Sequence, residues 1–278
     1  MVTIEVRPRG PYSLALSARL ASDATRTFRD GVFTACLPAG AGEAWQRPDG
    51  AVCVRATGEE AAAQLRFCLA LDDDHTPFLR RFAGDPLLGR ATRLLRGLRP
   101  LRTATVAHAL LRALCGQLID SRTARSLERR IVRAATPCAG SLHRPPTRSD
   151  LARLPPARLR SLGLHERRGA ALARICAGLD LERLHGVPGE AVRARLGRER
   201  GLGPWSVGVV CLQGLGRFDQ GLEGDLGLVK LLAALRGRRV EAWETAELLE
   251  PYGEFAGLAS VYLLAAFGRG LVPLPAAA

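Results

Sequence analysis

The 278-residue chain has one lysine and few aromatic residues. Lys230 is that lysine, and Phe, Trp and Tyr together make up 5% of the chain. Covalent catalysis through a Schiff base needs an amine, so Lys230 is the one side chain that offers it. No glycine-rich phosphate loop precedes Lys230, which excludes a Walker-type nucleotide site.

The chain also lacks the patterns of a metal site, a hydrolase triad or a membrane protein. Its seven cysteines lie singly, without C-x-x-C spacing, so we expect reduced core thiols and no metal. No G-x-S-x-G motif occurs, and the five histidines are dispersed. The start has no apolar signal region, and the longest apolar run, 258–267, is too short for a bilayer. We therefore expect a soluble protein of a bacterial-type cytoplasm, with no membrane partner.

Positive charge is what the sequence has in excess. The 40 basic residues exceed the 27 acidic ones and give a formal charge of +13. Each phosphate that a basic side chain neutralises releases condensed counterions, which favours a nucleic acid as the partner. The alternative is codon bias, since all basic residues except Lys230 are arginine.

Two parts differ in their hydrophobic pattern. Residues 1–75 contain three short β-prone runs (31–37, 50–55 and 64–69) and a helix within 13–20, so we predict a small α/β sheet domain. In residues 76–278, apolar residues recur three and four positions apart, which predicts an all-α domain. The longest predicted linker is 137–149. The fold class is α+β, with the antiparallel sheet first.

A two-glycine turn and a lone acid dominate the second part. The turn, Gly201-Leu202-Gly203-Pro204, separates predicted helices at 192–200 and 205–212. Glycines permit tight turns, and Pro204 suits a first helical turn whose N–H groups can then bind a phosphate. Asp225 follows about twenty residues later. Taken alone, the glycines are also explained as a helix C-cap, and Asp225 as the N-cap of the next helix.

Together the turn and the acid resemble the helix-hairpin-helix motif and catalytic aspartate of the helix-hairpin-helix DNA glycosylases. Within that superfamily the chain is similar to the 3-methyladenine DNA glycosylase II family. The stretches 159–164 and 251–256 match as well, and the resemblance extends from about Phe78 onward. It implies a glycosylase domain over 76–278 with its hairpin at about 192–213. It further implies that Asp225 is catalytic and that the hairpin's Gly201, Leu202 and Gly203 bind DNA.

Two further positions carry the resemblance. Trp205 stands where family members with lyase activity carry a Schiff-base lysine, which implies a monofunctional enzyme. The stretch 111–124, with a helix break at Gly116, is similar to the family's loop that inserts an apolar wedge into the duplex. Leu118 would be the wedge and Gln117 its polar neighbour at the DNA. A core leucine is the alternative interpretation of Leu118.

The base pocket departs from the family pattern. The resemblance places Trp205, Val209, Val261 and Tyr262 around the extruded base. Val209 stands where a tyrosine is typical, and Val261 lies at or beside the place of a tryptophan. Fewer rings weaken cation–π contact with a charged alkylated base, so the pocket is wider, less electron-rich or aimed at another damaged base.

The sequence therefore predicts a monofunctional DNA-base N-glycosylase. It would flip alkylated purines of the 3-methyladenine type out of duplex DNA and excise them, which initiates base excision repair. The alternative is a non-catalytic or differently specific lesion-binding protein on the same fold. The expected partner is double-stranded DNA with damaged bases, and the chain is expected to be a monomer. No cofactor is expected, although the resemblance implies a monovalent cation at the hairpin carbonyls.

Overall fold

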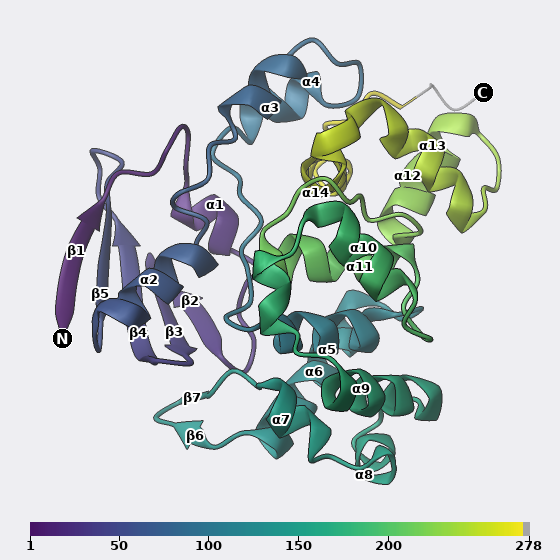
Figure 1. Ribbon diagram of the computed structural model, residues 1–278. Helices are drawn as coiled ribbons and strands as arrows, with labels where there is room; N and C mark the ends of the chain where they lie inside the picture. Colours follow the sequence, from purple (N-terminus) through teal and green to yellow (C-terminus); the bar gives the residue numbers. More distant parts are fainter. Residues whose placement is uncertain (275–278) are drawn as a thin grey trace.

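The computed structural model describes residues 1–274, with a sheet on one side and helices on the other (Figure 1). Five antiparallel strands form the sheet in the order β1-β5-β4-β3-β2. The turn between β2 and β3 places Asp30 and Gly31 at φ of 50° and 78°, as a tight hairpin requires. The strands are β1 (Val2–Val6), β2 (Arg26–Arg29), β3 (Val32–Leu37), β4 (Gly40–Gln46) and β5 (Val52–Ala56).

One helix covers the buried face of this sheet. Phe33, Ala44 and Val54 lie opposite one another on adjacent strands and are fully buried. They share a hydrophobic cluster with Leu65 of α2 (Glu59–Cys68). The strand predicted at 64–69 is therefore wrong. An apolar run this short fits both the two-residue period of a strand and the 3.6-residue period of a helix. In α2 the buried residues lie three and four positions apart, as in a helix.

The other predictions for the first part are mixed. The strands predicted at 31–37 and 50–55 are confirmed as β3 and β5, and the short helix α1 (Leu14–Ala18) lies within the predicted 13–20. Three strands, β1, β2 and β4, were not predicted. β4 is rich in glycine and alanine, which carry little strand propensity. The α+β class is confirmed.

Helices dominate the chain after residue 75. The central one is α5 (Val106–Gly116), which is buried along most of its length and contacts α6, α9 and α11. The others are α3 (Thr76–Arg81), α4 (Gly89–Leu94), α6 (Ser121–Ala135), α7 (Arg148–Ala152), α8 (Pro156–Ser161), α9 (Glu166–Gly178), α10 (Gly189–Gly197), α11 (Pro204–Val209), α12 (Leu226–Arg236), α13 (Thr245–Leu249) and α14 (Ala256–Phe267). Among residues 1–274, none of the helices combines the length and apolarity of a membrane span.

Short irregular elements connect these helices. They are the 3₁₀ helices η1 (Glu182–Gly186), η3 (Ala242–Glu244) and η4 (Glu250–Phe255), and the π-helix η2 (Val210–Leu215). The predicted linker 137–149 contains a small hairpin of β6 (Cys138–Ala139) and β7 (Leu142–His143). The single helix predicted over 151–162 is instead α7 and α8, because the adjacent prolines Pro155 and Pro156 end one helix and begin the next.

The segment between α4 and α5 joins the two parts. Arg99 is fully buried and donates hydrogen bonds to the carbonyls of Arg9, Pro11 and Ala70. Leu101 belongs to the hydrophobic cluster under the sheet. The boundary predicted near residue 75 stays a prediction, because contacts of this later segment cross it.

Candidate active site and DNA-facing loops

Asp225 caps the N-terminus of α12, as its sequence position predicted. Its Oδ1 accepts a hydrogen bond from the Gly227 N–H at 2.8 Å, and its Oδ2 accepts one from the Trp205 indole Nε1–H at 2.9 Å. The N–H of Gly224, at φ 83°, donates to Thr245 Oγ1 at 2.7 Å, which fixes the loop before the acid. Asp225 is half-buried, so its carboxylate is oriented through both oxygens and still reaches the surface.

The end of α5 makes room for the Trp205 ring. Trp205 lies in the first turn of α11, after Pro204. A Cβ on Gly116 would approach the ring atom Cη2 to 2.6 Å, closer than two carbons can pack. The sequence predicted a helix break at Gly116. It did not predict the contact of Gly116 with the Trp205 ring, because the two residues lie 89 positions apart.

The backbone angle requires a glycine at one of the two hairpin positions and not at the other. Gly201 has φ of 98°, and a Cβ there would lie 3.0 Å from Cβ of Ala171 on α9. Gly203, by contrast, has φ of −96°, which other residues adopt, and its Cβ would meet open space. The expectation that both glycines need special backbone angles is therefore wrong for Gly203. Leu202 is buried and anchors the turn, while Gly203 and Pro204 are exposed.

The loop between α5 and α6 projects a leucine into solvent. Leu118 is 85% exposed, and its φ of 57° is rare for a leucine. The alternative interpretation of Leu118 as a core residue is therefore wrong. Next to it, Gln117 Nε2 donates to the Gly201 carbonyl at 2.8 Å and to Ser206 Oγ at 2.9 Å. This amide, predicted to face DNA, ties the loop to the hairpin.

The structure does not support two members of the predicted base pocket. Tyr262 is fully buried, and its hydroxyl donates to the carbonyls of Leu95 and Leu98 at 3.1 and 3.0 Å. Val209 lies in the same hydrophobic core, whereas Val261 is half-buried. Successive residues of a helix point about 100° apart. On α14, Tyr262 therefore points into the core while its neighbour Val261 is half-exposed.

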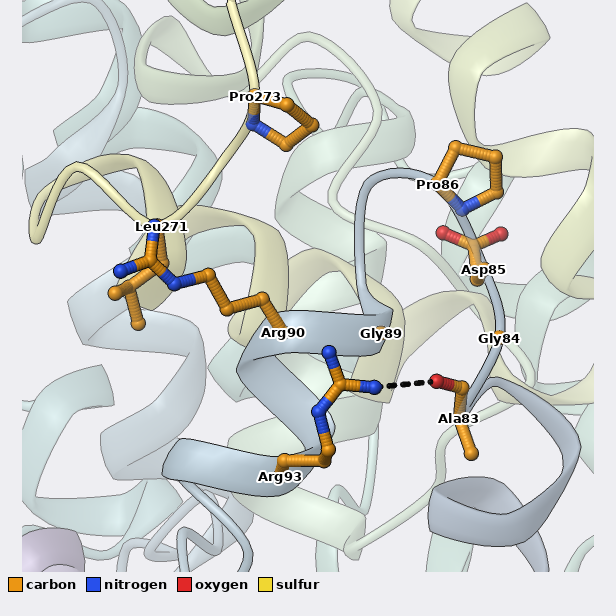
Figure 2. Close-up of a pocket in the computed structure, with 9 residues that line it drawn as sticks. All are labelled: Ala83, Gly84, Asp85, Pro86, Gly89, Arg90, Arg93, Leu271 and Pro273. Carbon is orange, nitrogen blue, oxygen red and sulfur yellow. Dashed lines mark hydrogen bonds between the residues drawn. The ribbon is translucent and has the colours of Figure 1, made fainter.

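A cavity of about 240 Å³ lies elsewhere, between the loop before α4 and the C-terminal segment (Figure 2). Arg90, Arg93 and Leu271 help to line it, and Arg93 donates to the Ala83 carbonyl at 3.1 Å. No residue predicted for the active site lines this cavity, so it is not part of the candidate site.

One buried group of side chains has the composition of a metal site. Ligand atoms of Asp23, His108 and Glu128 lie within 4.8 Å of one another. The guanidinium of Arg112, however, donates to Asp23 at 2.6 Å and to Glu128 at 2.8 Å. Burial opposes ionisation of Glu128, but the charge of Arg112 and the hydrogen bond from His108 prevail and lower its pKa to about 2. The group is thus an ion-pair network that already contains its cation.

Several hairpin carbonyls are engaged by hydrogen bonds. Those of Glu199, Arg200 and Gly201 accept hydrogen bonds from Leu202, Arg174 and Gln117 respectively. The Arg174 guanidinium also brings positive charge to the turn. The monovalent cation that the resemblance implies stays a prediction, and no chemical step is assigned to it.

The chain is similar in sequence to curated proteins. No family model matches the chain. A DNA-3-methyladenine glycosylase of Bacillus subtilis is 29% identical over 217 residues, which is 74% of this chain and 71% of that protein. A probable bifunctional transcriptional activator/DNA repair enzyme AlkA of Mycobacterium tuberculosis is 28% identical over 245 residues, 82% of this chain but 49% of that protein. The chain thus spans about half of this second relative.

Solved structures share the fold over nearly the whole chain. A 3-methyladenine DNA-glycosylase from Archaeoglobus fulgidus superposes with a TM-score of 0.82 at 20% identity, covering 97% of this chain and 99% of that one. An 8-oxoguanine glycosylase/lyase of Clostridium acetobutylicum, solved with double-stranded DNA, gives 0.79 at 17% identity and the same coverage. The chain is thus similar in sequence to curated proteins named for 3-methyladenine excision and DNA repair, and its fold is that of the helix-hairpin-helix DNA glycosylases.

Proposed function

We propose that the chain is a monofunctional DNA-base N-glycosylase that excises alkylated purines of the 3-methyladenine type from duplex DNA. The observation that carries this proposal is the carboxylate of Asp225, held between the Gly227 N–H and the Trp205 indole at a half-exposed position beside the hairpin. The names of the curated relatives support the substrate class.

Cleavage of the N-glycosidic bond needs mainly a negative charge close to the sugar. Alkylation at a ring nitrogen makes the purine positive and weakens its bond to C1′ of the sugar. As that bond breaks, the base leaves with the electron pair and an oxocarbenium-like cation develops, which the Asp225 carboxylate stabilises. Water then adds to C1′ and loses its proton to the carboxylate or to solvent.

The target base must first leave the stack. Leu118 projects from the loop that Gln117 attaches to the hairpin, so a hydrogen bond connects the proposed wedge loop to the proposed phosphate-binding turn. Insertion of the leucine would fill the space behind the extruded nucleotide. The hairpin, with Gly203 open to solvent, would hold the backbone without reading sequence. We propose that the protein does this as a monomer on DNA that contains damaged bases.

A lyase step is not part of the proposal. Trp205 has no amine, and its indole N–H is engaged by Asp225. Lys230 is exposed on α12, five residues after the acid. Borohydride should therefore trap no covalent adduct between protein and DNA, because no Schiff base forms.

A second candidate is a lesion-binding protein of different specificity. The burial of Val209 and Tyr262 favours it, because these residues do not supply the open aromatic pocket that stacks on a charged base. Of the four predicted pocket residues, Trp205 and Val261 remain half-exposed.

Release of free base distinguishes the two candidates. Duplex DNA treated with a methylating agent is incubated with the protein, and the released bases are separated by chromatography. The proposal predicts 3-methyladenine in the soluble fraction and abasic sites in the intact strand. Tight binding of the alkylated duplex without any released base would favour the second candidate.

A further inference from the structure

Helix α6 contains more arginines than any other helix in residues 1–274. Its 15 residues contain five arginines and a single acid, Glu128. Four residues of the helix are buried, and they lie on the face opposite to the arginines: Leu127, Glu128, Ile131 and Val132. The arginine stripe consists of Arg122, Arg125, Arg129, Arg130 and Arg133.

None of the five arginines pairs with a carboxylate in the part of the chain that the structure describes. Glu128 is engaged by Arg112 and His108 instead. Arg129 donates to the Ser22 carbonyl at 3.4 Å, which leaves its charge uncompensated. Apart from the half-buried Arg129, the helix therefore presents four exposed positive charges without a neutralising partner in the described residues.

This arrangement is unfavourable for an isolated helix. Arg125, Arg129 and Arg133 are spaced four residues apart, and like charges at that spacing repel each other. Arg122 adds a positive charge to the first turn, where the helix dipole favours a negative one. A helix needed for packing alone would be more stable with acids among these positions, which points to a negatively charged ligand.

The stripe starts at the loop that faces DNA. α6 begins three residues after the exposed Leu118, and Gln117 attaches this loop to the hairpin. From Arg122 to Arg133 the helix rises about 17 Å. Phosphates of one DNA strand are about 3.4 Å apart along the axis, so the stripe matches the length of about five phosphates.

The acidic residues are concentrated elsewhere. Residues 240–254 contain five glutamates and no basic residue, and they form the region of α13, which lies far from α6 in the view of Figure 1. Arginines outside this segment pair with three of the five glutamates, Glu244, Glu247 and Glu254, whereas the α6 arginines have no acidic partner within residues 1–274. A polyanion is therefore attracted more strongly to the α6 side of the molecule.

We propose that the arginine stripe of α6 binds the phosphate backbone of the duplex arm next to the extruded nucleotide. It would extend the DNA interface beyond the hairpin and the wedge, without sequence preference. The identity of the polyanion as DNA rests on the proposed function. The charge pattern itself favours a polyanion whether or not the proposed function is correct.

Salt dependence of DNA binding tests this directly. In one variant Arg122, Arg125 and Arg133, which are exposed, are each replaced by Gln, a good helix former that also relieves the repulsion. A control variant carries Arg80→Gln on α3, Arg90→Gln on α4 and Arg96→Gln just after α4; all three positions are exposed, and the variant removes the same charge. The dissociation constant for a duplex with an uncleavable abasic analogue is measured from low to moderate salt.

The α6 variant should fold with an unchanged or higher melting temperature and bind at least tenfold more weakly at low salt. Its slope of log affinity against log salt should be less steep by about 2 to 3, since each lost phosphate contact contributes about 0.9. An unchanged slope would overturn the proposal. So would an equal change in the control, because net charge alone would then explain the effect.

The outcome is independent of catalysis. A stripe-dependent slope in a protein that releases no base would leave this inference standing and reject the proposed function. Base release by a protein whose slope does not depend on the stripe would support the proposed function and reject this inference.

Discussion

Trp205 has a second task in this chain beside the base contact that its sequence position predicts. Its indole N–H donates a hydrogen bond to Asp225. The ring rests against the backbone end of α5, where Gly116 leaves room for it. At the scale of single residues, Trp205 therefore positions the carboxylate, and its effect on catalysis should depend on the N–H.

Replacing Trp205 by Phe keeps a ring and removes that N–H. A hydrogen bond to a charged group contributes about 1.5–3 kcal/mol, so we expect excision to slow by roughly ten- to a hundredfold. The rate constant under saturating enzyme should fall while affinity for duplex DNA stays within a few fold. A wild-type rate would show that the indole does not orient Asp225.

Gly116→Ala tests the same contact from the other side. Its Cβ would collide with the Trp205 ring at 2.6 Å, so the ring must move and the bond to Asp225 is lost. Excision should slow at least tenfold. Gly178→Ala at the end of α9 is the matched control, because its Cβ meets open space. Equal rates for the two variants would contradict the account.

At the scale of elements, the α5–α6 loop stores backbone strain. Leu118 adopts a φ of 57° that glycine takes freely and leucine adopts only at an energetic cost. Such strain at an exposed apolar side chain is unexplained by packing, since Leu118 contributes nothing to the core. It is consistent with a residue whose side chain is needed outside the protein.

Two variants of Leu118 separate strain from function. Leu118→Gly relieves a left-handed conformation that costs about 1–2 kcal/mol, and the greater freedom of glycine in the unfolded chain offsets about 0.4–1 kcal/mol of this gain. The free energy of unfolding should therefore rise slightly, while Leu118→Ala should leave it nearly unchanged. Both should slow excision from a fully paired duplex far more than from a mismatched one, where unstacking is easier. A large fall in melting temperature, or equal rate losses on both duplexes, would reject the wedge.

The sequence predicted those elements whose identity is local. The Asp225 cap, the break at Gly116 and the β3 and β5 strands follow from neighbouring residues, and each is confirmed. Contacts between distant segments carry no local signal, so the Gln117 tether was not predicted. Tyr262 was misplaced because a match to a family motif gives a position along α14 but not the side that faces the core.

At the scale of the whole molecule, a buried charge network connects the first part of the chain to α5 and α6. Arg112 bridges Asp23 and Glu128, which are 105 residues apart. Burial opposes the charge on both acids, yet neighbouring arginines lower both pKa values, that of Glu128 from 4.5 to about 2. The network therefore stabilises the fold when both carboxylates are ionised.

The sign of the pH dependence follows from the lowered pKa values. The stabilisation is complete above about pH 4.5, the ordinary pKa of Glu128, and is lost as the pH falls toward 2. Glu128→Gln leaves Asp23 as the one acid shared by Arg26 and Arg112 and should lower the unfolding free energy at pH 7 by about 3 kcal/mol. Denaturant unfolding from pH 7 to 2 should show this difference shrinking. A difference that is constant with pH would refute the assignment.

The central claim is that the Asp225 carboxylate performs the excision. The most direct measurement is the single-turnover rate of base release from an alkylated duplex by Asp225→Asn, with the affinity for the same duplex measured in parallel. Asn keeps the shape and can still cap α12, but it removes the charge that stabilises the sugar cation. We predict a rate at least a hundredfold lower at an affinity within a few fold of the wild type. Base release at the wild-type rate would contradict the account.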